Sequence, residues 1–442
     1  MSPELMIALG MFASLVVGLF MGFPIAFVLN GIALIFGVAF WGTNVIDLFI
    51  QKIYGTMANN VLMAIPLFIF MANILEKSRL SDKIFESARE LAGPLKGGVA
   101  IAVVVVSTLL AACTGIIGAS VVAAGLIALP IMNRYHYNKP LSTGVVGAAG
   151  SLGILIPPSI MLIVMAANSS CSVGGLFAGA VFPGLILSSL YIIYILVICA
   201  IHPDYAPAMP LEERLNMPIK ERWITFAKGA VPSLVLIFGV LGSIFSGIAT
   251  PTEAAGVGAF LMLILTMVYR RFTVKLLKQS IFGALNNSAM VMFIVIGATC
   301  FASVFLGLGG GREVASLLLG LPFGKWGVFF VIVIIITILG MFLDWIGIVF
   351  MLFPILLPLL PKLGFDQLWF IIVTAVVLQT SFLSPPLGYA LFFLKGISPE
   401  GITLGHIYRG VVPFIFLILL SLILFIVFPP IITWLPSLIA AG

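Results

Sequence analysis

Charged residues, histidine and cysteine are scarce in this chain of 442 residues. Only 8% of the residues are charged, and the chain holds 3 histidines and 4 cysteines. The cysteines stand far apart among small or apolar neighbours, which argues against a disulfide framework or a cysteine metal cluster. Neither a Ser-His-Asp nor a His-x-x-x-His pattern is present, so the sequence lacks the signatures of a hydrolase or a zinc protease.

Apolar residues dominate what is present. They make up 62% of the chain, with a mean hydropathy of +1.28. A soluble domain could not bury so much apolar surface, so the composition predicts a helical protein that crosses a membrane several times. The net charge of +6 does not indicate nucleic-acid binding, because the basic residues lie in short segments between apolar runs. We expect no cleaved signal peptide, since the first residues lack a basic stretch and the first apolar run is long enough to remain as a span.

Prolines recur at one fixed separation of 228 residues. The matching pairs are Pro94 and Pro322, Pro130 and Pro358, Pro157 and Pro385, and Pro158 and Pro386. Random placement of the prolines would give roughly 0.7 pairs at any one separation, so the pattern favours a duplicated unit. The alternative is that prolines cluster at the ends of helices without any duplication.

Loop charges predict the orientation of the spans. Basic residues concentrate in four segments, 77–96, 134–139, 214–228 and 270–278. Such loops lie in the cytoplasm, whereas the loops expected near 42–57, 309–326 and 361–366 are poorer in Lys and Arg and are placed outside. The chain then starts outside. The stretch 99–132 lies between two cytoplasmic loops, so it must enter and leave on the same side as a re-entrant hairpin.

The first half makes five crossings in this scheme, so the second half begins on the opposite side of the membrane. We therefore predict an all-α polytopic membrane protein with an inverted structural repeat, two re-entrant hairpins and two broken helices. The predicted units are a first repeat 1–201 with its hairpin at about 99–132 and its broken helix at about 144–167, a cytoplasmic connector 202–228, and a second repeat 229–442 with its hairpin at about 327–360 and its broken helix at about 367–394.

Two proline pairs stand deep inside apolar sequence, within 153–159 and 382–388. A proline pair removes two backbone donors and clashes with the preceding turn, so each predicted helix must break there. Broken backbone survives at membrane depth only against protein or a water-filled cavity, where free carbonyls can bind a ligand. Breaks at matching places in two halves point to the binding site of a secondary transporter.

The breaks offer oxygen ligands that suit a hard alkali cation such as Na⁺. The candidate backbone carbonyls belong to Gly153, Leu155, Pro158, Ser381, Leu383 and Pro386. Side-chain oxygens of Ser159, Thr380 and Ser384 lie close to them in the sequence.

The predicted tip of the first hairpin, 113–120, is rich in glycine and small hydroxyl residues. Such residues let two helix ends approach closely and expose backbone to an ion or a carboxylate. The candidates are Thr114, Gly115, Gly118 and Ser120. The alternative is a packing seam of small residues without a ligand.

The predicted tip of the second hairpin, 340–347, carries Asp344. A carboxylate at the centre of a membrane costs about 2.5–3.5 kcal/mol on insertion scales, so Asp344 is a functional candidate. The alternative is that Asp344 caps a helix at a wet hairpin tip. Glu253 is a second acidic residue near a span, and its spacing from Thr250 around a proline predicts a capping box at a helix start.

Five runs along the chain resemble the large membrane subunit of tripartite ATP-independent periplasmic (TRAP) transporters. They start at Pro66 (PLFIFMA), Gly150 (GSLGILIPPS), Ala249 (ATPTEAA), Gly340 (GMFLD) and Ser384 (SPPLG). The resemblance implies an elevator-type fold of the ion-transporter superfamily in the bacterial inner membrane, with a periplasmic N-terminus. It also implies Na⁺ as the coupling ion and two partners, a small four-helix membrane subunit and a periplasmic substrate-binding protein.

The first hairpin tip departs from the commonest family pattern. Many relatives carry Ser-Gly-Ser or Ser-Gly-Asn followed by Asp, whereas this chain has Thr114, Gly115, Ile116 and Ser120 at the aligned positions. Isoleucine donates no side-chain oxygen and Ser120 brings no charge, so the first Na⁺ site depends on Thr114 and backbone carbonyls. This tip resembles the subgroup linked to 2-oxo acids and other monocarboxylates.

These arguments define the predicted site and function. The predicted substrate contacts are Thr114, Gly115, Gly118, Ser120, Ser159, Asp344, Ser384 and Gly388, and the predicted Na⁺ ligands are Thr114, Gly153, Leu155, Pro158, Asp344, Ser381, Leu383 and Pro386. The leading hypothesis is Na⁺-coupled import of small organic acids, such as monocarboxylates, C4-dicarboxylates or sialic-acid-like acids. The alternative is a self-sufficient Na⁺/carboxylate or anion symporter, while an intramembrane enzyme and a channel are disfavoured because polarity is confined to a few broken points.

Overall fold

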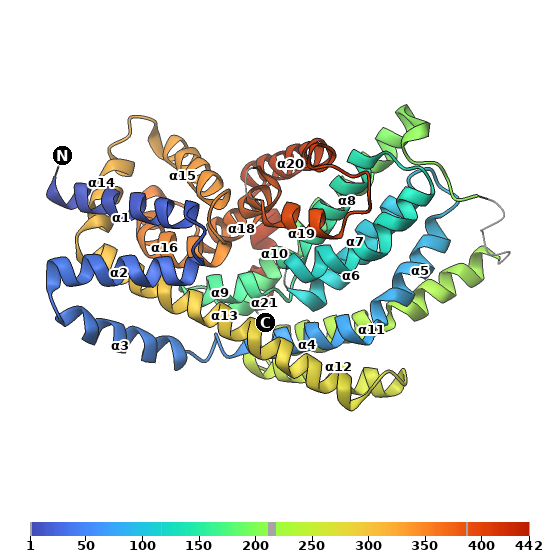
Figure 1. Cartoon of the computed structure of the whole chain (residues 1–442), viewed down its shortest axis with the longest axis horizontal. Coiled ribbons are helices and arrows are strands. Elements are labelled where there is room, and N and C mark those ends of the chain that lie inside the picture. Colours follow the sequence, from blue (N-terminus) through green and yellow to red (C-terminus); the bar gives the residue numbers. More distant parts are fainter. Residues whose placement is uncertain (1, 116, 211–217, 386–387, 442) are drawn as a thin grey trace.

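The computed structural model describes residues 2–115, 117–210, 218–385 and 388–441. Helices form nearly all of this part of the chain, and no strand occurs within it (Figure 1). The predicted all-α polytopic class is confirmed. Seven segments are long and apolar enough to cross a membrane: α1 (Pro3–Phe20), α10 (Val173–Ile201), α11 (Ile219–Phe245), α12 (Pro251–Val268), α13 (Val274–Gly307), Trp345–Leu363 and α20 (Leu404–Val427).

Both predicted hairpins and both predicted breaks occur in the structure. The first set consists of α6 (Gly98–Thr114), α7 (Ile117–Arg134), α8 (Lys139–Ser151), a 3₁₀ turn at Leu152–Ile154 and α9 (Ile160–Ala167). The second set consists of α15 (Gly324–Gly340), α16 (Trp345–Leu356), α18 (Gln367–Leu383) and α19 (Tyr389–Ile397). A hairpin, a broken helix and a long helix thus follow one another twice, as a duplicated unit requires. The exact boundaries of the two repeats stay a prediction.

Several segments that we expected to be loops contain helices. The expected outer loops 42–57 and 309–326 contain α3 (Asn44–Met57) and α14 (Gly310–Leu319), and the basic segment 77–96 contains α5 (Leu80–Ala92). These helices are amphipathic: α5 buries Ile84 and Ala88, which are one turn apart, and leaves Lys83 and Glu86 exposed. Their polar face lowers the mean hydropathy, so these helices do not appear as long apolar runs in the sequence.

Three boundaries also differ from expectation. The helix α11 begins at Ile219, inside the predicted connector 202–228, because Pro218 fixes its first turn. The helix α13 begins at Val274, inside the basic segment 270–278 that we expected to be a loop, and Thr273 caps it by accepting the Leu276 N–H at 3.1 Å. A further helix, α21 (Pro430–Ala441), follows α20.

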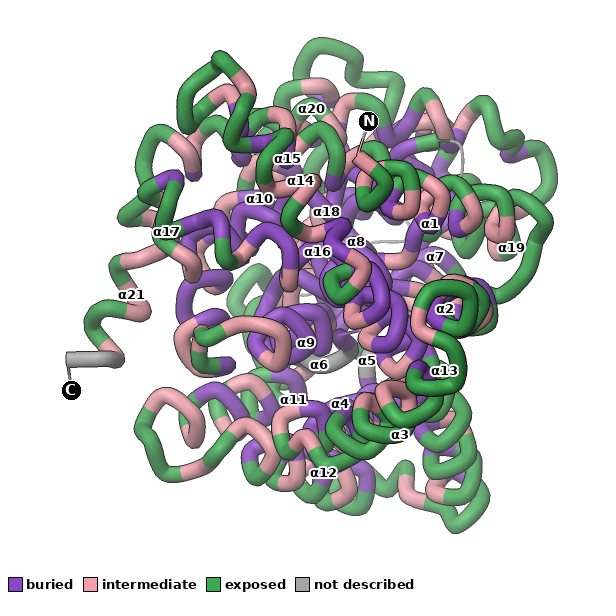
Figure 2. Tube along the Cα trace, turned by 90° about the vertical axis from the view of Figure 1, so that its left-hand side faces the viewer, coloured by how far each residue is buried: buried purple, intermediate pink, exposed green. Residues whose placement is uncertain are grey.

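The broken helices lie at the centre of the molecule. Every residue is buried over Leu141–Ser151 of α8, Ile160–Ala166 of α9 and Trp369–Leu383 of α18. Figure 2 shows these segments as the buried middle, with α3, α12 and α13 on the outside. A helix that is apolar all round belongs inside a protein. The fold therefore surrounds the first break with protein, whereas Pro385 of the second break is exposed.

The long helix α13 forms one side of this centre. It packs against α2 (Ile25–Trp41) and α4 (Ala64–Ser78), and it runs along the lower side of the molecule in Figure 1. It also contacts α16 of the second hairpin. The helices α8 and α20 pack closely against each other, as do α7 and α19, so each hairpin-and-break unit is joined to the other half of the chain.

Candidate functional site

A cavity of about 710 Å³ lies where the two hairpin tips face each other. Its walls come from both tips, from the starts of α9 and α19, and from α2, α4 and α13. Residues more than 200 positions apart in the sequence, such as Gly115 and Asp344, line the same space. This cavity is the candidate binding site.

The first tip turns at Gly115, between α6 and α7. Gly115 has a φ of +61°, a left-handed conformation that glycine adopts without steric cost. A Cβ at this position would lie 3.1 Å from Ile160 Cγ1, so the tip is seated on the first residue of α9. A Cβ on Gly118 would lie 2.7 Å from the Phe393 ring of α19. The first tip therefore contacts both the first broken helix and the C-terminal part of the second.

The second tip places Asp344 at the start of α16. Its carboxylate caps the helix by accepting the Ile346 N–H at 3.4 Å. The capping role and the position on the cavity wall occur together, so the two interpretations of Asp344 are compatible. Among the described residues, no lysine or arginine forms an ion pair with this carboxylate. A cation in the cavity would therefore not have to displace a resident positive charge.

The opposite wall is polar and comes from α4 and α13. Asn73, Glu76 and Lys77 of α4 and Asn287 of α13 line the cavity. Lys77 Nζ donates to the Gln279 carbonyl of α13 at 3.0 Å, which ties the two helices together. The cavity thus offers a carboxylate at one tip, and a second carboxylate (Glu76) together with amide and ammonium donors on the facing helices. This set of groups can hold a cation and an organic anion side by side.

The first break is buried behind the cavity rather than open to it. Gly153, Leu155, Pro158 and Ser159 are fully enclosed, and none of them lines the cavity. The Ser159 hydroxyl donates to the Ile154 carbonyl and accepts the Leu162 N–H at 3.4 Å, which caps α9. The side chain of Ser159 is thus used within the break, and its backbone positions Ile160 on the cavity wall.

The second break combines satisfied and unsatisfied hydroxyl groups. Ser384 donates to the Thr380 carbonyl at 2.7 Å, and the Gly388 N–H donates to the Ser384 carbonyl at 3.1 Å. Ser381 differs, because its buried hydroxyl has no hydrogen-bond partner among the described residues. Leu383 is buried at the end of α18, and Pro386 lies outside the described residues. A buried, unpartnered oxygen beside a helix break is chemically suited to coordinate a small cation.

Two further predicted contacts, Ser120 and Thr114, belong to the first tip. Ser120 lines a separate cavity of about 20 Å³, together with Ser107 of α6 and Phe85 of α5. The structure therefore does not bring Ser120 to the cavity that holds Asp344. Thr114 is the last residue of α6, and its side chain lies outside the described part.

Of the residues that line the cavity, Gly115, Gly118 and Asp344 were predicted from the sequence and the others were not. Tyr389, Phe393, Lys77 and Asn287 are four of these others. Tyr389 and Phe393 belong to α19, directly after the second break, and Lys77 and Asn287 belong to the facing helices. The matching Asn59-Asn60 and Asn286-Asn287 pairs in the two halves were a usable signal for Asn287. In the sequence, Lys77 served only to predict on which side of the membrane its segment lies. It is far from both predicted hairpins along the chain, so nothing in the sequence placed it at the cavity.

Known proteins match almost the whole chain. The family described as "Tripartite ATP-independent periplasmic transporter, DctM component" matches residues 12–431. The chain belongs to this TRAP large-permease family. It is 32% identical over 387 residues to the C4-dicarboxylate TRAP transporter large permease protein DctM of Pseudomonas aeruginosa, covering 87% of this chain and 88% of that protein. It is 31% identical over 450 residues to the protein of the same description from Rhodobacter capsulatus, covering 98% and 100%.

The fold of this TRAP large permease is also similar to a solved transporter structure. The YdaH transporter of Alcanivorax borkumensis superposes with a TM-score of 0.63 over 94% of this chain and 99% of that chain, at 14% sequence identity. Identity this low supports a shared fold and nothing further. Membership of the TRAP family makes the chain a multi-pass membrane subunit of a transporter, and not an enzyme.

Proposed function

We propose that this TRAP large permease imports small organic acid anions in symport with Na⁺. The observation that carries the proposal is the shared cavity, where the Asp344 tip faces the Gly115 tip and the amide groups of α4 and α13. The relatives named as C4-dicarboxylate permeases support carboxylates as the substrate class. Monocarboxylates, including 2-oxo acids, remain within the proposed range, because the cavity wall offers one lysine, Lys77.

Coupling follows from the charges at the cavity. A substrate carboxylate near Asp344 meets a like charge, and two such charges about 4 Å apart repel by about 4 kcal/mol at an effective dielectric constant near 20. A Na⁺ ion held by Asp344 and Ser381 would remove this repulsion and tighten the second tip. Substrate and Na⁺ then increase each other's affinity by the same factor, as linkage requires. The first tip would contribute its backbone and Thr114 to the same site.

We propose an elevator movement for the transport step. The hairpins and broken helices enclose the cavity from one side, and α2, α4 and α13 close it from the other. Sliding the first group against the second would carry the bound pair from one face of the membrane to the other. In this scheme the glycines at the tips allow the helix ends to pass close to the facing helices.

Two partner proteins complete the proposed transporter. A small four-helix membrane subunit would support the outer helices, and a periplasmic binding protein would release the anion into the cavity. We propose that the large permease lies in the bacterial inner membrane and that its N-terminus lies in the periplasm, as its loop charges indicate. The alternative, a self-sufficient Na⁺/carboxylate or anion symporter, predicts uptake by the large permease alone.

Uptake by proteoliposomes tests the proposal. Vesicles containing the large permease, the small subunit and a saturating amount of binding protein are expected to accumulate the anion that the binding protein carries only when a Na⁺ gradient is imposed. Omitting either partner should abolish uptake. Equal uptake with choline in place of Na⁺ would exclude Na⁺ as the coupling ion, and equal uptake without the partners would favour the self-sufficient symporter.

A further inference from the structure

A second, strongly basic cavity lies next to the candidate site. This basic pocket has a volume of about 230 Å³ and forms where the end of α4 meets the start of α13. Four of its lining residues are basic, Lys77, Arg79, Arg271 and Lys275, and none is acidic. Four like charges around one small space are unfavourable unless an anion joins them.

Protein groups neutralise this basic pocket only in part. All four basic residues are exposed, and none of them forms an ion pair within the described part of the chain. Asp82 of α5 is the acidic residue whose charge interacts with Arg79 and Arg271, and it does not line the pocket. Glu76 of α4 is a second such residue, because its charge interacts with that of Lys77. With Asp82 and Glu76 both counted, two positive charges remain in excess. Lys77 is held across the pocket by its bond to the Gln279 carbonyl, so the two walls are fixed relative to each other.

Arg79 has an unusual backbone conformation. Arg79 links α4 to α5 with a φ of +53°, in the left-handed region that favours glycine. Glycine there would form the same turn at lower conformational cost. The turn therefore carries a basic side chain although glycine would form it at lower cost, as do the turns at His136 and Arg270 with their own side chains.

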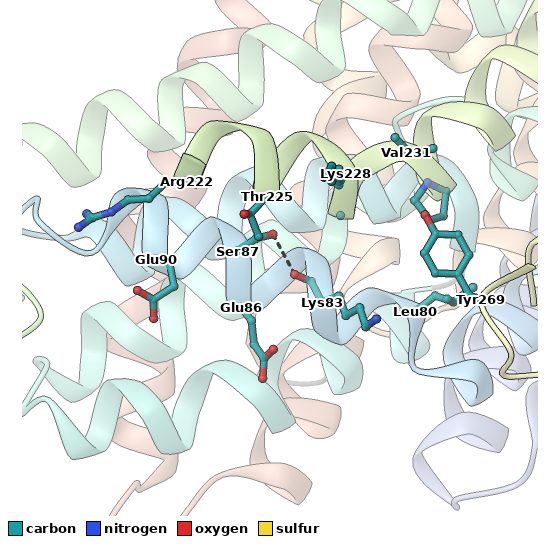
Figure 3. A pocket seen from close by; sticks show the side chains of 12 residues that line it. Leu80, Lys83, Glu86, Ser87, Glu90, Arg222, Thr225, Lys228, Val231 and Tyr269 are labelled. Atoms are coloured by element: carbon teal, nitrogen blue, oxygen red, sulfur yellow. Dashed lines mark hydrogen bonds between the residues drawn. The ribbon is translucent and has the colours of Figure 1, made fainter. Parts of the chain in front are cut away.

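A groove that is apolar at one end and lined elsewhere mainly by charged and polar residues lies beside the basic pocket. A cavity of about 570 Å³ runs between α5 and α11, and Figure 3 shows its lining side chains. The two spaces adjoin, because Leu80 of the groove follows Arg79 and Tyr269 lies two residues before Arg271. In Figure 3 Leu80, Val231 and Tyr269 line one end of the groove, whereas Glu90 and Arg222 lie at the other. The end with these apolar side chains is therefore the one next to the basic pocket, and Lys83 and Lys228 lie beside them.

The depth of the basic pocket in the membrane is set by α12. This helix has 18 residues and is thus about 27 Å long, close to the thickness of the hydrocarbon core, about 30 Å. Arg271 follows its C-terminal end, so the pocket lies at the level of the lipid headgroups. Tyr269 at the same helix end is the kind of residue found at that level.

We propose that an anionic phospholipid occupies these two spaces. Arg79, Arg271 and Lys275 bind the phosphate of the headgroup, and the start of one acyl chain lies against Leu80, Val231 and Tyr269 at the apolar end of the groove. Basic pockets between membrane helices on the cytoplasmic side bind the headgroups of anionic lipids in this way. A free oxyanion would satisfy the basic pocket, but it would leave the apolar end of the groove exposed.

The lipid would join the two halves of the chain. The basic pocket and the groove are built from α4 and α5 of the first half and from α11 to α13 of the second. A lipid bound there fastens the wall that carries Lys77 and Asn287. This proposal does not depend on which ion or acid the candidate site transports.

Lipid retention by the purified full chain tests the proposal. Native mass spectrometry should detect phosphatidylglycerol bound to the wild-type protein after detergent exchange, and no retained phosphatidylcholine. The variant Arg79→Gln/Arg271→Gln should bind phosphatidylglycerol roughly 30-fold more weakly, since each basic residue near an anionic lipid contributes about 1 kcal/mol and about 1.4 kcal/mol is a factor of ten. The matched control Arg312→Gln/Lys362→Gln removes two positive charges outside the pocket and should retain the lipid.

A variant in the groove tests lipid binding independently, in case the Arg79→Gln/Arg271→Gln variant fails to fold. Val231→Trp fills the groove while all four basic residues remain, and it should also reduce retention of phosphatidylglycerol. Equal retention by the wild type and both test variants would overturn the proposal. Displacement of the lipid by inorganic phosphate alone would also overturn it, because the pocket would then be a site for free oxyanions.

Discussion

Gly340 ends the first helix of the second hairpin directly against Ser381 of the second broken helix. A Cβ added to Gly340 would overlap the Ser381 side chain, and the Ser381 hydroxyl has no hydrogen-bond partner among the described residues. The hairpin and the broken helix therefore touch at an oxygen atom that is buried but not satisfied. Asp344 lies four residues further along the same tip. This contact is where we expect Na⁺ to act.

Gly340→Ala should separate the hairpin from the broken helix. The added methyl group has no room, and overpacking of this kind typically costs about 1–3 kcal/mol. We expect a lower midpoint of thermal unfolding in detergent and a strong loss of Na⁺-driven uptake. The control is Gly256→Ala on α12, where a Cβ would meet no atom within 4 Å. Wild-type stability and uptake in Gly340→Ala would show that the contact is not required.

Ser381→Ala should remove the response of the protein to Na⁺. A ligand that binds only the folded state raises its unfolding temperature as the ligand concentration rises. We expect Na⁺ to stabilise the wild type, and to stabilise Ser381→Ala much less. Ser421→Ala is the matched control, because Ser421 is equally buried but donates to the Ile418 carbonyl at 2.7 Å. If both variants respond to Na⁺ as the wild type does, Ser381 is not an ion ligand.

Asp344→Asn should abolish Na⁺-dependent uptake with little change in expression. Asparagine caps a helix about as well as aspartate, so the variant removes the charge and keeps the start of α16. Asp366→Asn is the matched control, since Asp366 caps α18 by accepting the Trp369 N–H at 2.7 Å and lies outside the cavity. Uptake rates with and without Na⁺ check both variants. Equal loss in the two would indicate a capping effect rather than a binding site.

The sequence predicted the breaks and the tips because their signals are local. Proline pairs end helices wherever they stand, and the predicted tip at 113–120 turns at Gly115, which has a left-handed conformation. The same holds for Thr250 and Glu253, whose predicted capping box is confirmed at the start of α12. Each of these features depends on a few neighbouring residues and not on the rest of the chain.

The sequence was less informative where the face of a helix decides which residues line the cavity. Gly118 lines the cavity and Ser120 does not, although only one residue separates them. Successive helix residues are about 100° apart, so Ser120 lies about 200° around α7 from Gly118 and faces α5 and α6 instead. The position of Lys77 at the cavity depends on how α4 packs against α13, and a single sequence does not specify that packing.

Gly410→Ala should destabilise the crossing of α8 and α20. A Cβ on Gly410 would overlap the Pro140 carbonyl and lie 2.9 Å from the Gly144 nitrogen, and a Cβ on Gly144 would overlap the Gly410 carbonyl. These neighbours are backbone atoms, which cannot rotate away as side chains do, so the two helices must move apart. We expect a loss of at least about 1–3 kcal/mol, measured as a lower midpoint of thermal unfolding.

Gly405→Ala on the same helix is the control for this prediction. A Cβ there would meet Thr403 at 3.6 Å, which is ordinary van der Waals contact. Alanine favours a helix over glycine by about 1 kcal/mol, so this variant should be as stable as the wild type or more stable. Because α8 leads directly into the first break, Gly410→Ala should also lower uptake, whereas Gly405→Ala should not. Equal midpoints for the two variants would mean that α8 and α20 tolerate a wider separation than their glycines indicate.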